Sequence, residues 1–275
     1  MFKSFLEETK WLLIISFFLL AVLGGNVYWF ATHSVVEDNF RHAPNFEDPN
    51  KDVPPPLVWK QIGPHLYTLT GMIAVDDCER IVPEIPKDDH PFTVILESPG
   101  GSLADGACLA GHLKIRNVVT VVRNTPVINE DGEVLYTPGK IGLVGDPDPD
   151  GKVICASSCT LIFLAGDNRY LIGDVWIGIH GPKTPDSHID TISKRALESS
   201  SYRTSAAIMM MLDQLGITDN AIKYMFVQIP ATSMYWLNTK DWEYKPELKY
   251  LATHYKNFWG FTGVGDVGYE GTQHE

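Results

Sequence analysis

Positive charge is scarce in this sequence. Lysine and arginine together number 22 against 34 aspartates and glutamates, which gives a formal net charge of −12. A protein that binds nucleic acid needs a basic face to neutralise phosphates, so this balance argues against a nucleic-acid partner. Hydrophobic residues make up an ordinary 44% of the 275 residues, enough for one large domain or two small ones.

Cysteine is also rare, since the chain has only four: Cys78, Cys108, Cys155 and Cys159. So small a number fits either buried thiols or two disulfides. The cellular compartment decides between them, because disulfides persist only in oxidising surroundings.

A clean signal-peptidase site of the Ala-x-Ala kind is missing after the one long apolar run. Residues 11–31 are uncharged, and a helix of that length spans ~30 Å, the thickness of a bilayer core. Trp11 and Trp29 stand where interfacial aromatic residues are found. The segment therefore favours an uncleaved single-pass anchor over a cleaved signal peptide, with residues 1–10 in the cytoplasm and the bulk of the chain outside it.

Two flanking segments have little apolar periodicity. Residues 32–62 contain a Pro54–Pro56 triplet and charges of both signs, which is typical of a semi-rigid spacer. Residues 251–275 are rich in glycine and aromatic residues. Exposed aromatics there would indicate an oligomer or partner contact, and packing back onto the domain is the alternative.

Between them, residues 63–250 have the pattern of an α/β domain. Strands are expected over 66–71, from Val94 and over 118–122, with helices over 75–84 and 103–113 between them. This alternation predicts a right-handed parallel unit. A further helix is expected over 202–215, where a methionine run indicates core packing.

The central stretch of the domain leads a strand into a serine pair. Residues 153–156 are apolar and strand-like, Ser157 and Ser158 follow, and residues 159–165 form an apolar helix closed by Gly166. Backbone N–H groups are unpaired at such a junction and the helix dipole is positive there. An ordinary N-cap is the plain alternative for either serine.

Two further segments supply what a reactive serine requires. His180 follows a strand over 175–179, and a histidine is the base that makes a serine nucleophilic at neutral pH. Gly100 and Gly101 follow the Val94 strand. A glycine pair lets the backbone approach a ligand closely and aim its N–H groups at an oxyanion.

Together, Ser98–Ser102 (SPGGS), Ala156–Cys159 (ASSC) and Ile179–Pro182 (IHGP) resemble the Clp protease proteolytic-subunit superfamily. The superfamily includes signal peptide peptidase A and NfeD-type peptidases, and the nearest likeness is to a periplasmic branch with a Cys-x-Ser-x-Cys signature. The resemblance implies a crotonase-like spiral of ββα units over residues 63–250. It implies an inner-membrane serine peptidase with its domain in the periplasm, acting on peptides or proteins without a cofactor.

Site roles follow from the same resemblance. Ser157 matches the nucleophile, His180 the base, and Gly100 and Gly101 the oxyanion loop, with Ser158 as a second backbone donor. In an oxidising compartment a Cys155–Cys159 disulfide across the junction is conceivable, and pairing of Cys108 with Cys78 is the alternative.

Residues 124–151 depart from the family pattern as an insertion. A turn at 129–132 between short apolar runs predicts a β-hairpin, which is a candidate lid or partner-docking element. Asp146, Asp148 and Asp150 imitate the start of a calcium loop, yet Ser157 stands where that loop requires a glutamate. A solvated acidic turn is favoured, and no metal is expected.

The family's third catalytic residue, an aspartate, would align near Met234, where no acid stands. Asp219 and Asp241 flank that region without a clear relation to His180. A Ser–His dyad oriented by a backbone carbonyl or by Thr232 remains workable, and a Ser–Lys dyad using Lys183 is a weaker variant.

Three functions follow in order of preference. The first is a membrane-anchored, ATP-independent serine peptidase. The second is an inactive relative that serves as scaffold or accessory subunit of a membrane protein complex or homo-oligomer. The third is a crotonase-type acyl-thioester enzyme, which would use the oxyanion loop without a paired Ser and His.

Overall fold

The computed structural model divides the chain into two compact units, Met1–Phe40 and Arg41–Glu275. It describes residues 40–42, 54–88, 90–139, 152–182, 194–230 and 232–256. Almost all of these belong to the second unit, which is mixed α/β with several sheets, as the sequence predicts.

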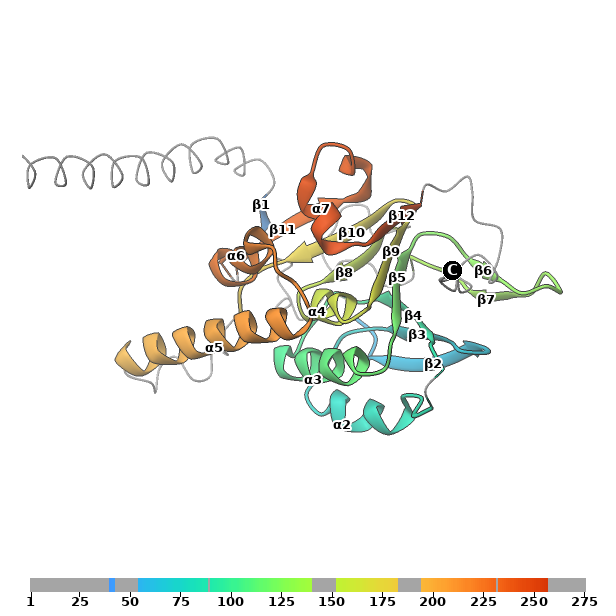
Figure 1. Cartoon of the computed structure of the whole chain (residues 1–275), viewed down its shortest axis with the longest axis horizontal. Coiled ribbons are helices and arrows are strands. Elements are labelled where there is room, and N and C mark those ends of the chain that lie inside the picture. Colours follow the sequence, from blue (N-terminus) through green and yellow to red (C-terminus); the bar gives the residue numbers. More distant parts are fainter. Residues whose placement is uncertain are drawn as a thin grey trace, which may run out of the picture. The chain divides into compact units, whose positions relative to one another are not determined.

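The larger sheet has six strands in the order β12-β9-β5-β4-β3-β2 (Figure 1). From β3 through to β12, each pair of neighbouring strands is parallel. The edge strand β2 pairs antiparallel with β3. The strands are β2 (Val58–Gly63), β3 (Leu66–Thr70), β4 (Thr93–Glu97), β5 (Val119–Arg123), β9 (Asn168–Ile172) and β12 (His254–Lys256).

The second sheet has four strands in the order β1-β11-β10-β8. Its β8 and β10 run in parallel, and β11 is antiparallel to β10. A separate hairpin is formed by β6 and β7, as predicted for the insertion. These strands are β1 (Phe40–His42), β6 (Val127–Ile128), β7 (Val134–Tyr136), β8 (Val153–Ala156), β10 (Val175–Ile179) and β11 (Ser233–Asn238).

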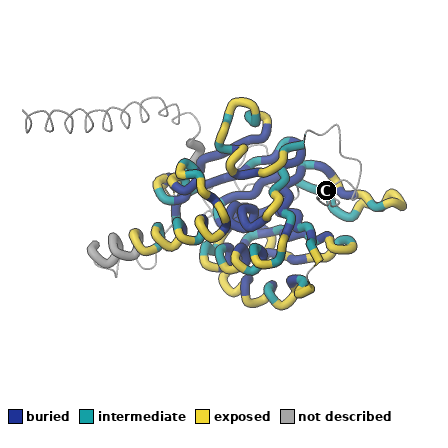
Figure 2. The backbone as a smooth tube through the Cα atoms, in the orientation of Figure 1, coloured by how far each residue is buried: buried dark blue, intermediate teal, exposed yellow. Residues whose placement is uncertain are grey.

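One short helix, α4 (Ser158–Leu164), is buried along its whole length. It contacts β4 and β5 of the larger sheet and β8 and β10 of the smaller one, so it lies in the core between them (Figure 2). Its sequence explains this position, because a helix that is apolar all round belongs in a core. The other helices are α2 (Asp77–Ile81), α3 (Leu103–Lys114), α5 (Lys194–Gln214), α6 (Asn220–Gln228) and α7 (Pro246–Leu251), with 3₁₀ turns at Val82–Glu84 and Thr239–Asp241.

The folded domain begins earlier than the sequence suggested. Strand β2 falls inside the segment expected to be a spacer, directly after the proline triplet. Trp59 anchors it, since this side chain is 9% exposed and stacks on Tyr67 at 5.0 Å. Strands β9, β11 and β12 were not predicted either, because each has few apolar residues or an irregular pattern and is defined by its neighbours in the sheet.

Among the described residues, no helix is both long and apolar enough to cross a bilayer. The anchor predicted over residues 11–31 lies outside the described residues. The same is true of the acidic turn at 146–151, of Lys183, and of the tail from residue 257 onward.

The packing of α4 leads to a prediction about stability. Phe163 is fully buried in this helix, so Phe163→Ala should lower the free energy of unfolding by about 3–5 kcal/mol, measured by urea denaturation. Val75→Ala is the control, because Val75 is 76% exposed and its loss should change that free energy by less than about 0.5 kcal/mol. Equal effects of the two substitutions would contradict the central place of α4.

Candidate active site

The parallel pairing of β8 with β10 brings two predicted site residues to one edge. Ala156 at the end of β8 is the register partner of Gly178 in β10. Ser157 therefore comes one residue after Ala156, and His180 two residues after Gly178, at the carboxyl ends of neighbouring strands. In α/β proteins this is the edge where reactive groups gather.

Ser157 occupies a strained turn. Its backbone has φ 56° and ψ −124°, a conformation that residues with a Cβ seldom adopt. Its N–H donates to the Gly178 carbonyl at 2.8 Å, and its carbonyl accepts from Thr160 N at 3.0 Å. The side chain makes no capping hydrogen bond, so the ordinary N-cap interpretation does not apply to Ser157. A serine on a sharp strand-to-helix turn of this kind is typical of a nucleophile.

A disulfide closes over the same turn. Cys155 and Cys159 are bonded, with their Cα atoms 5.3 Å apart, and both are buried. The bond links the end of β8 to the first turn of α4 and encloses Ser157 in a small covalent ring. The alternative pair, Cys78 with Cys108, is a disulfide as well, so no free thiol remains in the chain.

His180 has its tautomer fixed by the main chain. Its Nδ1 lies 2.5 Å from the carbonyl oxygen of Gly181. A carbonyl can only accept, so Nδ1 carries the proton and Nε2 is left as the basic nitrogen. Burial lowers the pKa of the His180 ring, while the hydrogen bond to Gly181 acts in the opposite direction. The ring is therefore neutral near pH 7 and able to accept a proton.

The glycine pair packs directly against the Ser157 turn. Gly100 has φ 94° and Gly101 φ 136°, and a Cβ at Gly100 would lie 2.5 Å from the Ala156 carbonyl and 2.6 Å from the Ser157 Cβ. Only glycine permits this approach.

Of the three N–H groups considered as oxyanion donors, only that of Gly100 already has an acceptor among the described residues. Gly100 N–H donates to Ser98 Oγ at 3.0 Å, so it is engaged within the loop. No hydrogen bond found among the described residues uses the N–H of Gly101. Ser158 is the first residue of α4, and its N–H has no acceptor inside that helix. Gly101 and Ser158 are thus the candidate oxyanion donors, and Gly100 contributes close approach.

The Ser157 hydroxyl and the His180 ring share this edge, but no hydrogen bond joins them in the described part of the chain. Catalytic hydrogen bonds are often long before substrate binds, so this does not exclude a dyad. No described carboxylate contacts His180 either. Met234, at the position of the family's acid, is buried against Gly178. Asp219 caps α6 and Asp241 pairs with Lys245.

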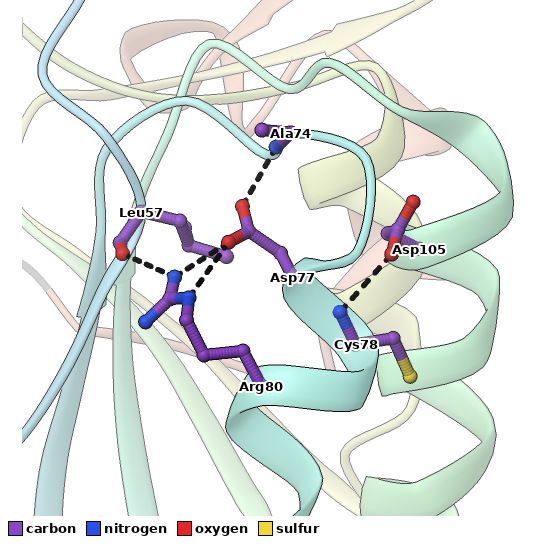
Figure 3. A network of polar contacts seen from close by, with 6 residues as sticks. All are labelled: Leu57, Ala74, Asp77, Cys78, Arg80 and Asp105. Carbon is purple, nitrogen blue, oxygen red and sulfur yellow. Dashed lines mark hydrogen bonds and ion pairs between the residues drawn. The ribbon is translucent and has the colours of Figure 1, made fainter.

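The loop that contains Gly100 and Gly101 rests on the segment before α2. Ile73 N donates to the Gly100 carbonyl at 2.8 Å and its own carbonyl accepts from Ser102 N at 2.7 Å. The next residue, Ala74, donates to Asp77 Oδ2 at 2.7 Å, and Asp77 is held in turn by Arg80 (Figure 3). This support has no signal in the sequence, because it depends on contacts between segments.

Asp105 joins α2 to the start of α3. It accepts a hydrogen bond from the Ser102 hydroxyl at 2.5 Å. It also accepts one from the Cys78 N–H at 3.0 Å (Figure 3). The Cys78–Cys108 disulfide links the same two helices. A local signal was present here, because a serine followed three residues later by an acid resembles a capping box.

One group of metal-ligating residues comes together within the described ranges, namely Cys78, Cys108 and His112. The two sulfurs are bonded to one another, so neither is available as a thiolate ligand. The expectation that the site needs no metal stays a prediction.

Ser158 provides a test of the site's packing. Its side chain is 1% exposed, and its Oγ has no hydrogen-bond partner in the described structure. A buried hydroxyl without a partner is destabilising, so Ser158→Ala should raise the free energy of unfolding by about 1 kcal/mol in urea denaturation. A loss of similar size would show that the hydroxyl has a partner after all.

The assignment of the site depends on this geometry and on the sequence motifs. No model of a known protein family matches the chain, and comparison with curated proteins gives no match either. The three segments that carry the family resemblance nevertheless converge, since the loop of Gly100, the turn of Ser157 and the strand of His180 are neighbours in the structure.

Proposed function

We propose that the chain is a serine peptidase of the Clp-protease-like branch of the crotonase-like fold. The observation that carries the proposal is the strained Ser157 turn, pressed against Gly100 at the strand edge that also ends in His180. Ser157 combines φ 56° with ψ −124°, a costly conformation for a residue with a Cβ, and strained residues of this kind cluster at active sites.

In the proposed reaction the Ser157 hydroxyl attacks a peptide carbonyl, and its proton passes to Nε2 of His180. The N–H groups of Gly101 and Ser158 stabilise the tetrahedral oxyanion. His180 then donates the proton to the leaving amine, and the C–N bond breaks to leave an acyl-enzyme. A water molecule, deprotonated by His180, hydrolyses the ester and restores Ser157.

The Gly181 carbonyl takes part of the role of a triad acid, which none of the described residues supplies at His180. It keeps Nδ1 protonated and faces the positive charge that forms on the ring. A carbonyl has only a partial charge, so it stabilises the imidazolium less than a carboxylate does. We therefore expect a slower enzyme than one with a complete triad.

The proposed location is the inner membrane, with a single anchor over residues 11–31 and the domain in the periplasm. Two disulfides support this, because such bonds persist in oxidising compartments. The substrate would then be a peptide or protein on that side of the membrane.

A scaffold without activity is the second candidate. It is favoured by the lack of a described carboxylate at His180 and of a hydrogen bond from Ser157 to His180. A fluorophosphonate probe, which reacts with activated serines, distinguishes the two.

We expect the purified full chain to be labelled, and Ser157→Ala to abolish the labelling. Ser205→Ala is the matched control, since Ser205 lies on α5 outside the site, and it should be labelled like the unmodified protein. An unlabelled protein recovered in a stoichiometric membrane assembly would instead support the scaffold.

The rate of labelling should depend on pH in a defined direction. The basic form of His180 is needed, and burial holds its pKa below the usual 6.5. The rate should therefore fall as the solution is acidified, with an apparent pKa below 6.5, and be constant from pH 7 to 8. In His180→Ala this dependence should vanish and the rate should drop by at least ~100-fold. A midpoint above 7 would contradict the assignment.

A further inference from the structure

The inserted hairpin is packed onto the larger sheet. Val127 of β6 is 2% exposed and belongs to a cluster with Ile95 of β4 and Val121 of β5. Leu135 and Tyr136 of β7 pack against the same cluster. The turn beyond these residues is exposed (Figure 2). The base of the hairpin thus covers one sheet face, next to the carboxyl ends of β4 and β5.

A buried hydrogen bond fixes the hairpin at that edge. Glu97, the last residue of β4, is 1% exposed, and the Tyr136 hydroxyl donates to its Oε2 at 2.5 Å. A buried carboxylate is costly without such partners. Burial, followed by the charge of Glu97, raises the pKa of Tyr136, so the hydroxyl keeps its proton and remains a donor.

The neighbouring strand end binds the hairpin as well. Arg123, the last residue of β5, is 3% exposed, and its guanidinium donates to the hydroxyl and carbonyl of Thr125 and to the carbonyl of Pro126. The chain enters the hairpin at these residues. The insertion is therefore held by polar groups at two adjacent strand ends.

Glu97 is also joined to the oxyanion loop through the main chain. The next residue, Ser98, bonds to β8 by its N–H and its carbonyl, and its Oγ holds the Gly100 N–H. The Glu97 carbonyl accepts from Gly71 N at 3.1 Å. The backbone of Glu97 thus lies within the loop's hydrogen-bond network, whereas its carboxylate contacts the insertion.

We infer that Tyr136 and Glu97 are positioning residues, whose hydrogen bond lets the inserted hairpin hold the loop 98–101 in its active conformation. Without the Tyr136 hydroxyl, the buried carboxylate loses a charge-assisted bond and the end of β4 relaxes. The catalytic consequence, a poorly aimed Gly101 N–H, rests on the proposed function. The hairpin is then a support for the site, whereas the sequence suggested a lid or a partner-docking element.

The test is Tyr136→Phe, which removes one oxygen and keeps the ring. Tyr67→Phe is the matched control. Tyr67 lies in β3 of the larger sheet, to which Glu97 also belongs, and it pairs with Val94 near the other end of β4. Hydrogen exchange measured by mass spectrometry should become at least ~3-fold faster over residues 97–101 and 125–136 in Tyr136→Phe only. Glu97→Ala, which removes the acceptor of the tyrosine hydroxyl, should also speed exchange over the same residues.

The kinetics of fluorophosphonate labelling give a second readout. In Tyr136→Phe the maximal acylation rate should fall ~10-fold, less than the loss of a whole oxyanion donor, with the half-saturating probe concentration unchanged. Unchanged exchange over 97–101 overturns the inference, whether or not Ser157 reacts. Faster exchange with an unchanged acylation rate overturns the positioning role. If the unmodified protein is never labelled, the peptidase proposal is refuted. The exchange data then still show whether the Tyr136–Glu97 bond couples the hairpin to the loop 98–101.

Discussion

The site depends on one strained turn, in which Ser157 adopts a positive φ between β8 and α4. Such a conformation costs about 1–3 kcal/mol and persists only where the surroundings enforce it. Here the enforcement comes from the hydrogen bond to the Gly178 carbonyl, the Cys155–Cys159 disulfide and the full burial of α4. Glycine is required at position 100, because a Cβ there would collide with the Ala156 carbonyl and the Ser157 Cβ.

The main chain fixes the tautomer of His180, and no carboxylate of the described residues contacts its ring. The Gly181 carbonyl selects the tautomer, and Gly181 is itself fixed by donating its N–H to Ile229 at 2.8 Å. Orientation is therefore provided by the end of α6, but charge compensation is weak. Burial also lowers the pKa of the His180 ring. The neutral ring is therefore ready to accept a proton, and the imidazolium that results is destabilised.

The sequence indicated the convergence of the site but not its supports. Ser157, His180 and the glycine pair each follow an apolar strand, and parallel strands end at a common edge, so local patterns sufficed to bring them together. The Gly181 carbonyl and the Tyr136–Glu97 bond had no such signal, and Asp105 had only that of a capping box. Glu97 and Tyr136 are 39 residues apart, and their contact depends on how the hairpin lies on the sheet. The β11 strand was missed for the same reason, since pairing with β10 defines it.

Each of two segments of the candidate site is attached to a disulfide. Cys155–Cys159 closes the serine turn, whereas Cys78–Cys108 joins α2 to α3, the helix that follows Gly100 and Gly101. The two segments contact one another through the backbone hydrogen bonds of Ser98 with β8 and through the packing of α3 on α4. A reducing compartment would remove both links at once. The geometry of the site and an oxidising location are therefore coupled, since the strained turn is best maintained where the disulfides form.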